Sequence, residues 1–138
     1  MLNKNSLYLA WFVSLFALAG SLYFSEVLQY APCVLCWWER IFFYPLAFIL
    51  PVGIIKRDAN IFFYAVPLVV VGFFIALYHN LLYYNFISEA YAPCATGVSC
   101  ITRYINWLGF IDIPLLSLAG FTTILALLII NKKSHAIK

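Results

Sequence analysis

Apolar residues fill four long segments of the chain, and most of the charged residues lie between these segments or at the chain ends. Each segment approaches or exceeds the ~18–20 apolar residues that a helix needs to cross a hydrocarbon core of ~30 Å. The predicted spans cover approximately residues 7–28, 34–55, 61–84 and 113–130. The pattern predicts an all-α integral membrane protein, a bundle of four transmembrane helices in one domain over residues 1–138.

The first segment is predicted to be a membrane anchor rather than a cleaved secretory signal. Its apolar run exceeds the ~7–15 residues of a signal core, and the following YFSEVLQY lacks the small residues of a cleavage site. Composition agrees with four spans, since 66% of the 138 residues are hydrophobic and 9% are charged. A water-soluble domain of this length does not bury that much apolar surface.

Lysine and arginine are distributed unevenly between the two sides of the predicted bundle. One side carries Lys4, Lys56, Arg57, Lys132, Lys133 and Lys138. The other side carries only Arg40 and Arg103. The positive-inside rule therefore predicts that both termini are cytoplasmic and that the loops 29–36 and 85–112 face outward. The net charge of +3 follows from this bias, and nothing in the sequence indicates nucleic-acid binding.

All four cysteines fall on the outward side, Cys33 and Cys36 in the first loop and Cys94 and Cys100 in the second. Outside the cytoplasm disulfides persist. Of the three pairings that are available, sequence proximity favours one disulfide within each loop, and exchange between the pairs stays open. A Cys-x-x-Cys ring is too small to stabilise a fold much, and the second pair fits a zinc site badly. Redox exchange is therefore favoured over structural disulfides or a metal site.

Two sources of positive charge are expected near Cys36. Pro32 favours an extended entry into the second span, so Cys36 lies in or just before the first helical turn, where a helix N-terminus stabilises a thiolate. Arg40 follows one turn later on the same face, whereas Glu39 points elsewhere. An arginine just inside a membrane is a functional-site candidate, and its alternative is an interfacial arginine that snorkels to water.

Repeated oxidation of a dithiol requires an electron acceptor. No glycine-rich nucleotide fingerprint occurs in the sequence, and a bis-histidine haem is disfavoured because His135 lies in the charged tail. A lipid-soluble quinone is favoured, with its head group against Cys36 and Arg40. His79 in the third span is equally well explained as a quinone ligand or proton carrier and as an interfacial histidine bonded to a carbonyl. Asp112 is expected to be an ordinary solvated charge.

Three stretches of the chain match one protein family in combination: PCVLCWWER, PCATGVSC and YINWLGFIDIPLLSLAGF. With the four-span layout, they resemble the disulfide bond formation protein family DsbB, above all its short Gram-positive members of the BdbC type. The resemblance implies a thiol:quinone oxidoreductase of the bacterial cell membrane that reoxidises an extracytoplasmic thioredoxin-fold thiol oxidase of the DsbA/BdbD kind. That oxidase must be a separate protein, because the loops here are too short to form a thioredoxin domain.

The resemblance also implies a role for each cysteine and for Arg40. Cys33 and Cys36 would be the quinone-coupled pair, with Cys36 nearest the quinone and Arg40 in contact with it. Cys94 would be the sulfur that the partner's thiolate attacks, and Cys100 its resolving mate. Many Gram-negative members separate the second pair widely, whereas five residues intervene here, so transfer between the pairs must use a local movement. Whether the acceptor is menaquinone or ubiquinone stays open.

Two alternatives remain at this stage. A quinone-epoxide reductase of the vitamin K type is also a small helical bundle with a Cys-x-x-Cys, although its dithiol normally begins a later span. In a non-enzymatic metal-binding or accessory subunit, the cysteines would be metal ligands or would form structural disulfides. A thiol:quinone oxidoreductase is expected to consume quinone together with a reduced thioredoxin-fold partner, whereas a metal subunit is expected to bind zinc stoichiometrically.

Overall fold

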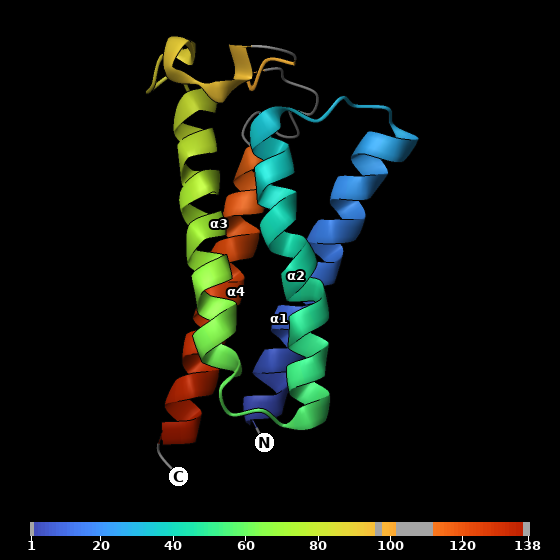
Figure 1. Cartoon of the computed structure of the whole chain (residues 1–138), viewed down its shortest axis with the longest axis vertical. Helices are drawn as coiled ribbons and strands as arrows, with labels where there is room; N and C mark the ends of the chain where they lie inside the picture. Colours follow the sequence, from blue (N-terminus) through green and yellow to red (C-terminus); the bar gives the residue numbers. More distant parts are fainter. Residues whose placement is uncertain (1, 96–97, 102–111, 137–138) are drawn as a thin grey trace.

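Four long α-helices make up most of the protein (Figure 1). The computed structural model describes residues 2–95, 98–101 and 112–136. The long helices are α1 (Leu2–Leu22), α2 (Val34–Lys56), α3 (Ile61–Tyr83) and α4 (Ile113–Ala136). Within the described ranges, all four are long and apolar enough to cross a membrane and no β-strand occurs, which confirms the predicted four-helix membrane bundle. Arg103 and Lys138, which entered the orientation argument, lie outside the described residues.

The helices run alternately up and down, and each has two main neighbours. α1 contacts α2 and α4, and α3 contacts the same two helices. The start of α1, the end of α4 and the α2–α3 turn lie at one end of the bundle, and the cysteine-bearing segments lie at the other (Figure 1). This arrangement separates the lysine-rich end from the cysteines as the sequence predicts. Which end faces the cytoplasm stays a prediction from the charge bias.

Local sequence signals fix both ends of α2. Cys33 is its N-cap in an extended conformation (φ −72°, ψ 169°), consistent with the preceding Pro32. At the other end, Arg57 adopts a left-handed conformation (φ 51°), and its N–H donates to the carbonyls of Gly53 and Ile54. The Asp58 carboxylate then accepts hydrogen bonds from the Asn60 N–H and from a tyrosine hydroxyl in α3. The backbone at this tight turn is thereby satisfied.

The middle of the bundle is closed by tight packing between the four helices. Phe43 of α2 stacks on Phe121 of α4 with ring centroids 3.9 Å apart. Gly72 of α3 is required here, because a Cβ added to it would approach the Phe121 ring to 2.4 Å. Trp11 of α1 donates its indole N–H to the Ala47 carbonyl of α2 at 3.1 Å. These contacts set the register in which the four helices meet.

The cysteine-bearing half is more open. In Figure 1 the second half of α1 tilts away from α2, and α1 continues into a π-helix, η1 (Tyr23–Val27). Short π-helical turns often occur at functional sites. An extended segment then leads to the start of α2, and two short 3₁₀-helices, η2 (Glu89–Tyr91) and η3 (Pro93–Ala95), follow α3. The tilt of α1 leaves space between the helices at the end where the cysteines lie.

Candidate active site

The first cysteine pair sits at the N-terminus of α2. Cys33 and Cys36 are free thiols with their Sγ atoms 2.9 Å apart, and the Cys36 backbone N–H donates to Cys33 Sγ at 3.3 Å. The hydrogen bond from the Cys36 side chain lowers the pKa of the Cys33 thiol, burial opposes this, and His79 adds to the lowering. The helix N-terminus was expected to stabilise a thiolate at Cys36. Cys36 does lie in the first turn of α2, and the sulfur that caps the helix is that of Cys33, which accepts from the Cys36 N–H.

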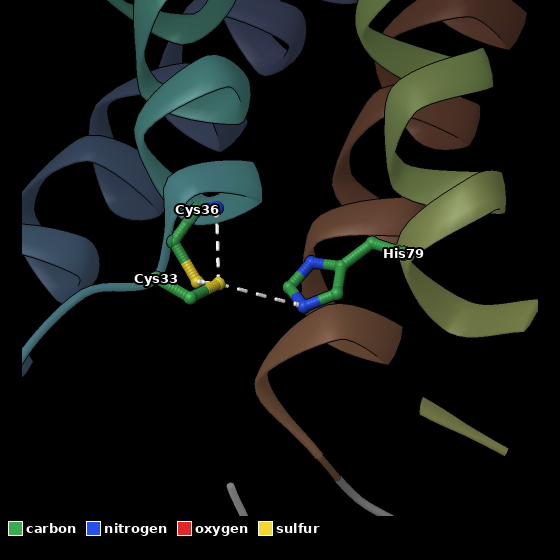
Figure 2. A group of neighbouring side chains, drawn as sticks. All are labelled: Cys33, Cys36 and His79. Atoms are coloured by element: carbon green, nitrogen blue, oxygen red, sulfur yellow. Dashed lines mark hydrogen bonds between the residues drawn. The ribbon is translucent and has the colours of Figure 1, made fainter. Parts of the chain in front are cut away.

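His79 of α3 reaches the same sulfur from the other side. Its Nε2 lies 3.8 Å from Cys33 Sγ, and Figure 2 shows the imidazole pointing at the cysteine pair. Its Nδ1 lies 2.9 Å from Glu39 Oε1, and both side chains are buried, with exposed fractions of 1% and 5%. Sequence reasoning connected His79 with a quinone and assigned Glu39 nothing. A signal was available: a carboxylate one turn after Cys36 inside an apolar helix requires a partner.

Arg40 is buried and held by α1 rather than extended toward water. Its Nε donates to Ser21 Oγ at 2.6 Å and its Nη2 to the Ser21 carbonyl at 2.8 Å. The guanidinium also lies 5.2 Å from the centroid of the Trp37 ring. Among the described residues its hydrogen bonds reach neither Cys36 nor Glu39. The snorkelling alternative is therefore wrong, and the missed partner is Ser21, which nothing in a local sequence pattern links to α2.

These side chains surround a cavity of about 500 Å³ between α1, α2 and α4, to which α3 contributes His79 and Tyr83. Its polar lining includes Cys33, Cys36, Arg40 and Ser117, and most of its wall is aromatic and aliphatic. The Ser117 Oγ is buried and has no hydrogen-bond partner among the described residues. Apolar walls with a few converging polar groups are typical of small-molecule sites. The cavity thus suits a flat apolar ligand with acceptor oxygens.

The second pair, Cys94 and Cys100, forms a disulfide with its Cα atoms 5.9 Å apart. Both residues are 4% exposed and belong to the same apolar cluster as Cys33 and Leu82, with Cys36 packed against it. Cys100 also lines the cavity. The fold therefore brings both pairs together, which suits the local transfer expected from the short loop. Because both sulfurs are buried, a protein partner reaches them only after the loop moves.

The expectation for Asp112 was wrong. This residue is 4% exposed, and its Oδ2 lies 3.5 Å from the Tyr84 hydroxyl at the end of α3. Asp112 directly precedes α4, and its backbone carbonyl accepts from the Leu116 N–H. Its side chain is buried because α3 and α4 pack together at this point, a long-range contact that the sequence does not display.

One group of side chains has the chemistry of a metal site. The sulfurs of Cys33 and Cys36 and a ring nitrogen of His79 lie within 4.8 Å of one another. Thiolate and imidazole are the usual ligands of zinc, and a carboxylate on the second histidine nitrogen, as Glu39 provides here, commonly orients such a ligand. The sequence favours redox exchange over a metal site, and a metal-binding measurement at these three residues tests that prediction.

Comparison with known proteins gives concordant matches. The family model "Disulfide bond formation protein DsbB" matches residues 3–131. "Probable disulfide formation protein C" of Halalkalibacterium halodurans is 43% identical over 133 residues, which cover 94% of this chain and 96% of the relative. "Disulfide bond formation protein C" of Bacillus subtilis is 41% identical over 126 residues, 91% of each chain. "Probable disulfide formation protein" of Metapseudomonas resinovorans is 40% identical over 130 residues, covering 94% and 90%.

No solved structure matches the chain. The sequence matches nonetheless extend over nearly the whole bundle, and the family match covers the positions of both cysteine pairs, so they confirm the resemblance that the motifs indicated. Membrane-spanning helices, a free dithiol and an adjacent disulfide are consistent with that assignment. The chain belongs to the disulfide bond formation protein family DsbB and is a disulfide-forming oxidoreductase of a membrane.

Proposed function

We propose that this oxidoreductase takes electrons from an extracytoplasmic thioredoxin-fold thiol oxidase and passes them to a membrane quinone. The observation that carries the proposal is the meeting of Cys33, Cys36, Cys100 and Arg40 at one cavity of about 500 Å³ with mostly apolar walls. Cys94 belongs to the apolar cluster that contains Cys33 and Cys100. An acceptor dissolved in the bilayer needs such a site, because the dithiol lies at a helix end and not in a water-soluble domain.

The residues around the cavity fit a quinone head group. A bound quinone would accept two electrons and two protons. Arg40 and Ser117 would hold its oxygens, since a guanidinium keeps its charge and donates in a plane, and the Ser117 hydroxyl has no partner among the described residues. Cys36 is less buried than Cys33 and also lines the cavity, which supports Cys36 as the sulfur nearest the acceptor. A contact between His79 and the quinone stays a prediction.

The cysteine pairs then act in series. The partner's dithiol reduces the Cys94–Cys100 disulfide, and the resulting thiols reduce a Cys33–Cys36 disulfide, so each exchange transfers two electrons and two protons. We assign Cys94 as the sulfur that the partner attacks and Cys100 as its resolving mate. Cys100 lines the cavity beside the first pair, which supports its role in the transfer between the pairs. The Cys33–Cys36 dithiol finally loses its electrons to the quinone and becomes a disulfide again.

The proposal includes a cell-membrane location with both termini cytoplasmic and all four cysteines outside. The supporting observation is the lysine- and arginine-rich end opposite the cysteines. Membrane-impermeant thiol reagents are expected to label the cysteines of intact cells after reduction. Labelling that appears only after lysis would place the cysteines in the cytoplasm and overturn the orientation.

The decisive experiment reconstitutes the purified protein in lipid nanodiscs with a reduced thioredoxin-fold oxidase. Quinone absorbance and the partner's redox state are followed together, with menaquinone and ubiquinone analogues in separate reactions. Equal amounts of oxidised partner and reduced quinone are expected with one or both classes. A Cys36→Ser variant is the matched control, because it keeps the fold and removes the sulfur assigned to the acceptor. Partner oxidation without quinone reduction would contradict the proposal.

A further inference from the structure

A buried row of three side chains joins α2 to α3 next to the first cysteine pair. Cys33 Sγ lies 3.8 Å from His79 Nε2, and His79 Nδ1 lies 2.9 Å from Glu39 Oε1. Glu39 and His79 form the one ion pair found among the described residues. Neither the motifs nor the comparisons assign anything to Glu39 or to this row.

The chemistry of the row depends on which imidazole nitrogen carries a proton. A carboxylate accepts hydrogen bonds only, so Glu39 fixes the His79 proton on Nδ1. Nε2 then presents a lone pair toward Cys33 Sγ (Figure 2). This is the arrangement of a nucleophile, a base and an orienting carboxylate that activates thiols and hydroxyls in other enzymes.

Burial makes a proton acceptor necessary at this position. Cys33 is 6% exposed, and forming a lone charge in such surroundings is costly. Transfer of the Cys33 proton to His79 creates an imidazolium between a thiolate and a carboxylate, so each new charge has an adjacent opposite charge. Arg40 does not compete for Glu39, because its hydrogen bonds among the described residues go to Ser21.

We propose that Glu39 and His79 are the acid–base pair of the Cys33–Cys36 dithiol, with His79 as the catalytic base and Glu39 as its positioning residue. When the disulfide forms, the S–S bond replaces two S–H bonds, and the Cys33 proton goes to His79 Nε2. Two electrons and the Cys36 proton leave for the electron acceptor. Because His79 lines the cavity, the imidazolium delivers the second proton to the acceptor bound in it. The acceptor thus receives two electrons and two protons in all. Reduction of the disulfide reverses the transfer. The inference rests on the proposed function only for the identity of the acceptor.

The groups around this row support its role. His79 is the base in contact with Cys33 Sγ, and Glu39 is in contact with the other nitrogen of the same ring. The other titratable or charged residues that line the same cavity are Cys36 and Arg40 of α2, Tyr83 of α3, and Tyr30 of the segment between η1 and α2. The cavity-lining residues of α1 and α4 are uncharged. His79 is therefore the base that contacts Cys33 directly.

The test is the pH dependence of Cys33 alkylation in the reduced full-length protein, with fragment mass spectrometry to separate Cys33 from Cys36. Only the thiolate reacts, so the rate for the natural protein is expected to persist at acidic pH and fall only as the pH drops through the lowered pKa. His79→Asn should move this inflection upward by roughly 1–3 units. Glu39→Gln keeps a hydrogen-bond acceptor but removes the charge, and should give a smaller shift in the same direction.

Asn80→Ala is the matched control. Asn80 is the next residue of α3 and donates to the Pro114 carbonyl at 2.8 Å, so the change breaks a buried interhelix hydrogen bond away from Cys33. Its alkylation profile should match that of the natural protein. An unchanged inflection in both His79→Asn and Glu39→Gln, or an equal shift in Asn80→Ala, would reduce the row to a structural link. If alkylation behaves as expected but quinone is never reduced, the acceptor assignment fails and the acid–base pair stands.

Discussion

The two cysteine pairs lie in one apolar cluster, yet the fold holds them differently. Cys33 and Cys36 occupy the cap and first turn of a long helix, beside the buried ionisable residues His79 and Glu39. The second pair lies in a 3₁₀-turn and the loop after it, between apolar side chains. The first pair thus lies on a long helix beside two ionisable side chains, whereas the second lies on a short turn and loop whose described neighbours are mainly apolar.

The difference separates two tasks. A dithiol that gives up electrons and protons at one cavity benefits from fixed distances, which a helix supplies better than a loop. A disulfide that meets another protein must become accessible, and short loops open at a lower free-energy cost than packed helices. The burial of the Cys94–Cys100 disulfide fits this division, since its opening can be coupled to arrival of the partner.

The largest effect is expected from serine substitutions that remove one pair at a time. Cys36→Ser should abolish quinone reduction with every reductant, because no disulfide can form at the cavity. Cys94→Ser should block oxidation of the partner but leave quinone reduction with a small dithiol. Cys100→Ser should trap a mixed disulfide with the partner through Cys94. Rates with the two reductants, and non-reducing gels, distinguish these outcomes. An adduct in Cys94→Ser but not in Cys100→Ser would reverse the two roles.

Substitutions of Arg40 test whether its positive charge contributes to quinone binding beside the first cysteine pair. Arg40→Met should weaken quinone affinity by roughly 1.5–3 kcal/mol, about 10- to 150-fold, because a charge-assisted hydrogen bond is lost. Arg40→Lys should recover only part of this, since an ammonium lacks the planar fork. The apparent quinone affinity is measured for each variant. An unchanged affinity in Arg40→Met would show that Arg40 serves only to anchor α1.

Zinc binding is expected at the first cysteine pair, because a histidine lies beside it. Zn²⁺ added to the reduced protein should bind Cys33, Cys36 and His79 and inhibit turnover reversibly, whereas the oxidised protein should not bind it at this site. Glu39→Gln should weaken binding by roughly 10- to 100-fold, because Glu39 orients the imidazole. Calorimetry and recovery of activity with a chelator measure both effects. Equal binding by a Cys94/Cys100 double serine variant would locate the metal at the first pair.

The smallest effect is expected at Ser21. Ser21→Ala removes the hydroxyl that accepts from Arg40 Nε but keeps the carbonyl that accepts from Nη2. Losing one such bond should cost about 0.5–1.5 kcal/mol, a few-fold in apparent quinone affinity. Ser14→Ala is a suitable control, because the Ser14 hydroxyl donates to the Trp11 carbonyl within α1 and does not line the cavity. A change in maximal rate without a change in apparent quinone affinity would show that Ser21 does not contribute to quinone binding.

The sequence alone determined the four helices and the shared end of the cysteines. Runs of apolar residues long enough to cross a bilayer leave little choice of secondary structure, because unpaired backbone groups are too costly in hydrocarbon. Two spans separate the two cysteine loops, which puts both loops on one side of the membrane. Proximity along the chain also anticipated the pairing of Cys94 with Cys100, and the spacing of Cys36 and Arg40 pointed to the site.

Only the tertiary structure decided which side chains meet. The helices are apolar on all faces, so their patterns do not show which face turns inward. The register that brings His79 to Cys33 and Glu39 is set by packing between helices that are distant in the sequence, such as that of Phe121 in α4 against Gly72 in α3. The bond from Arg40 to Ser21 likewise depends on how α1 lies against α2. Interhelix contacts between distant segments are properties of shape and packing, and these follow from all four helices together.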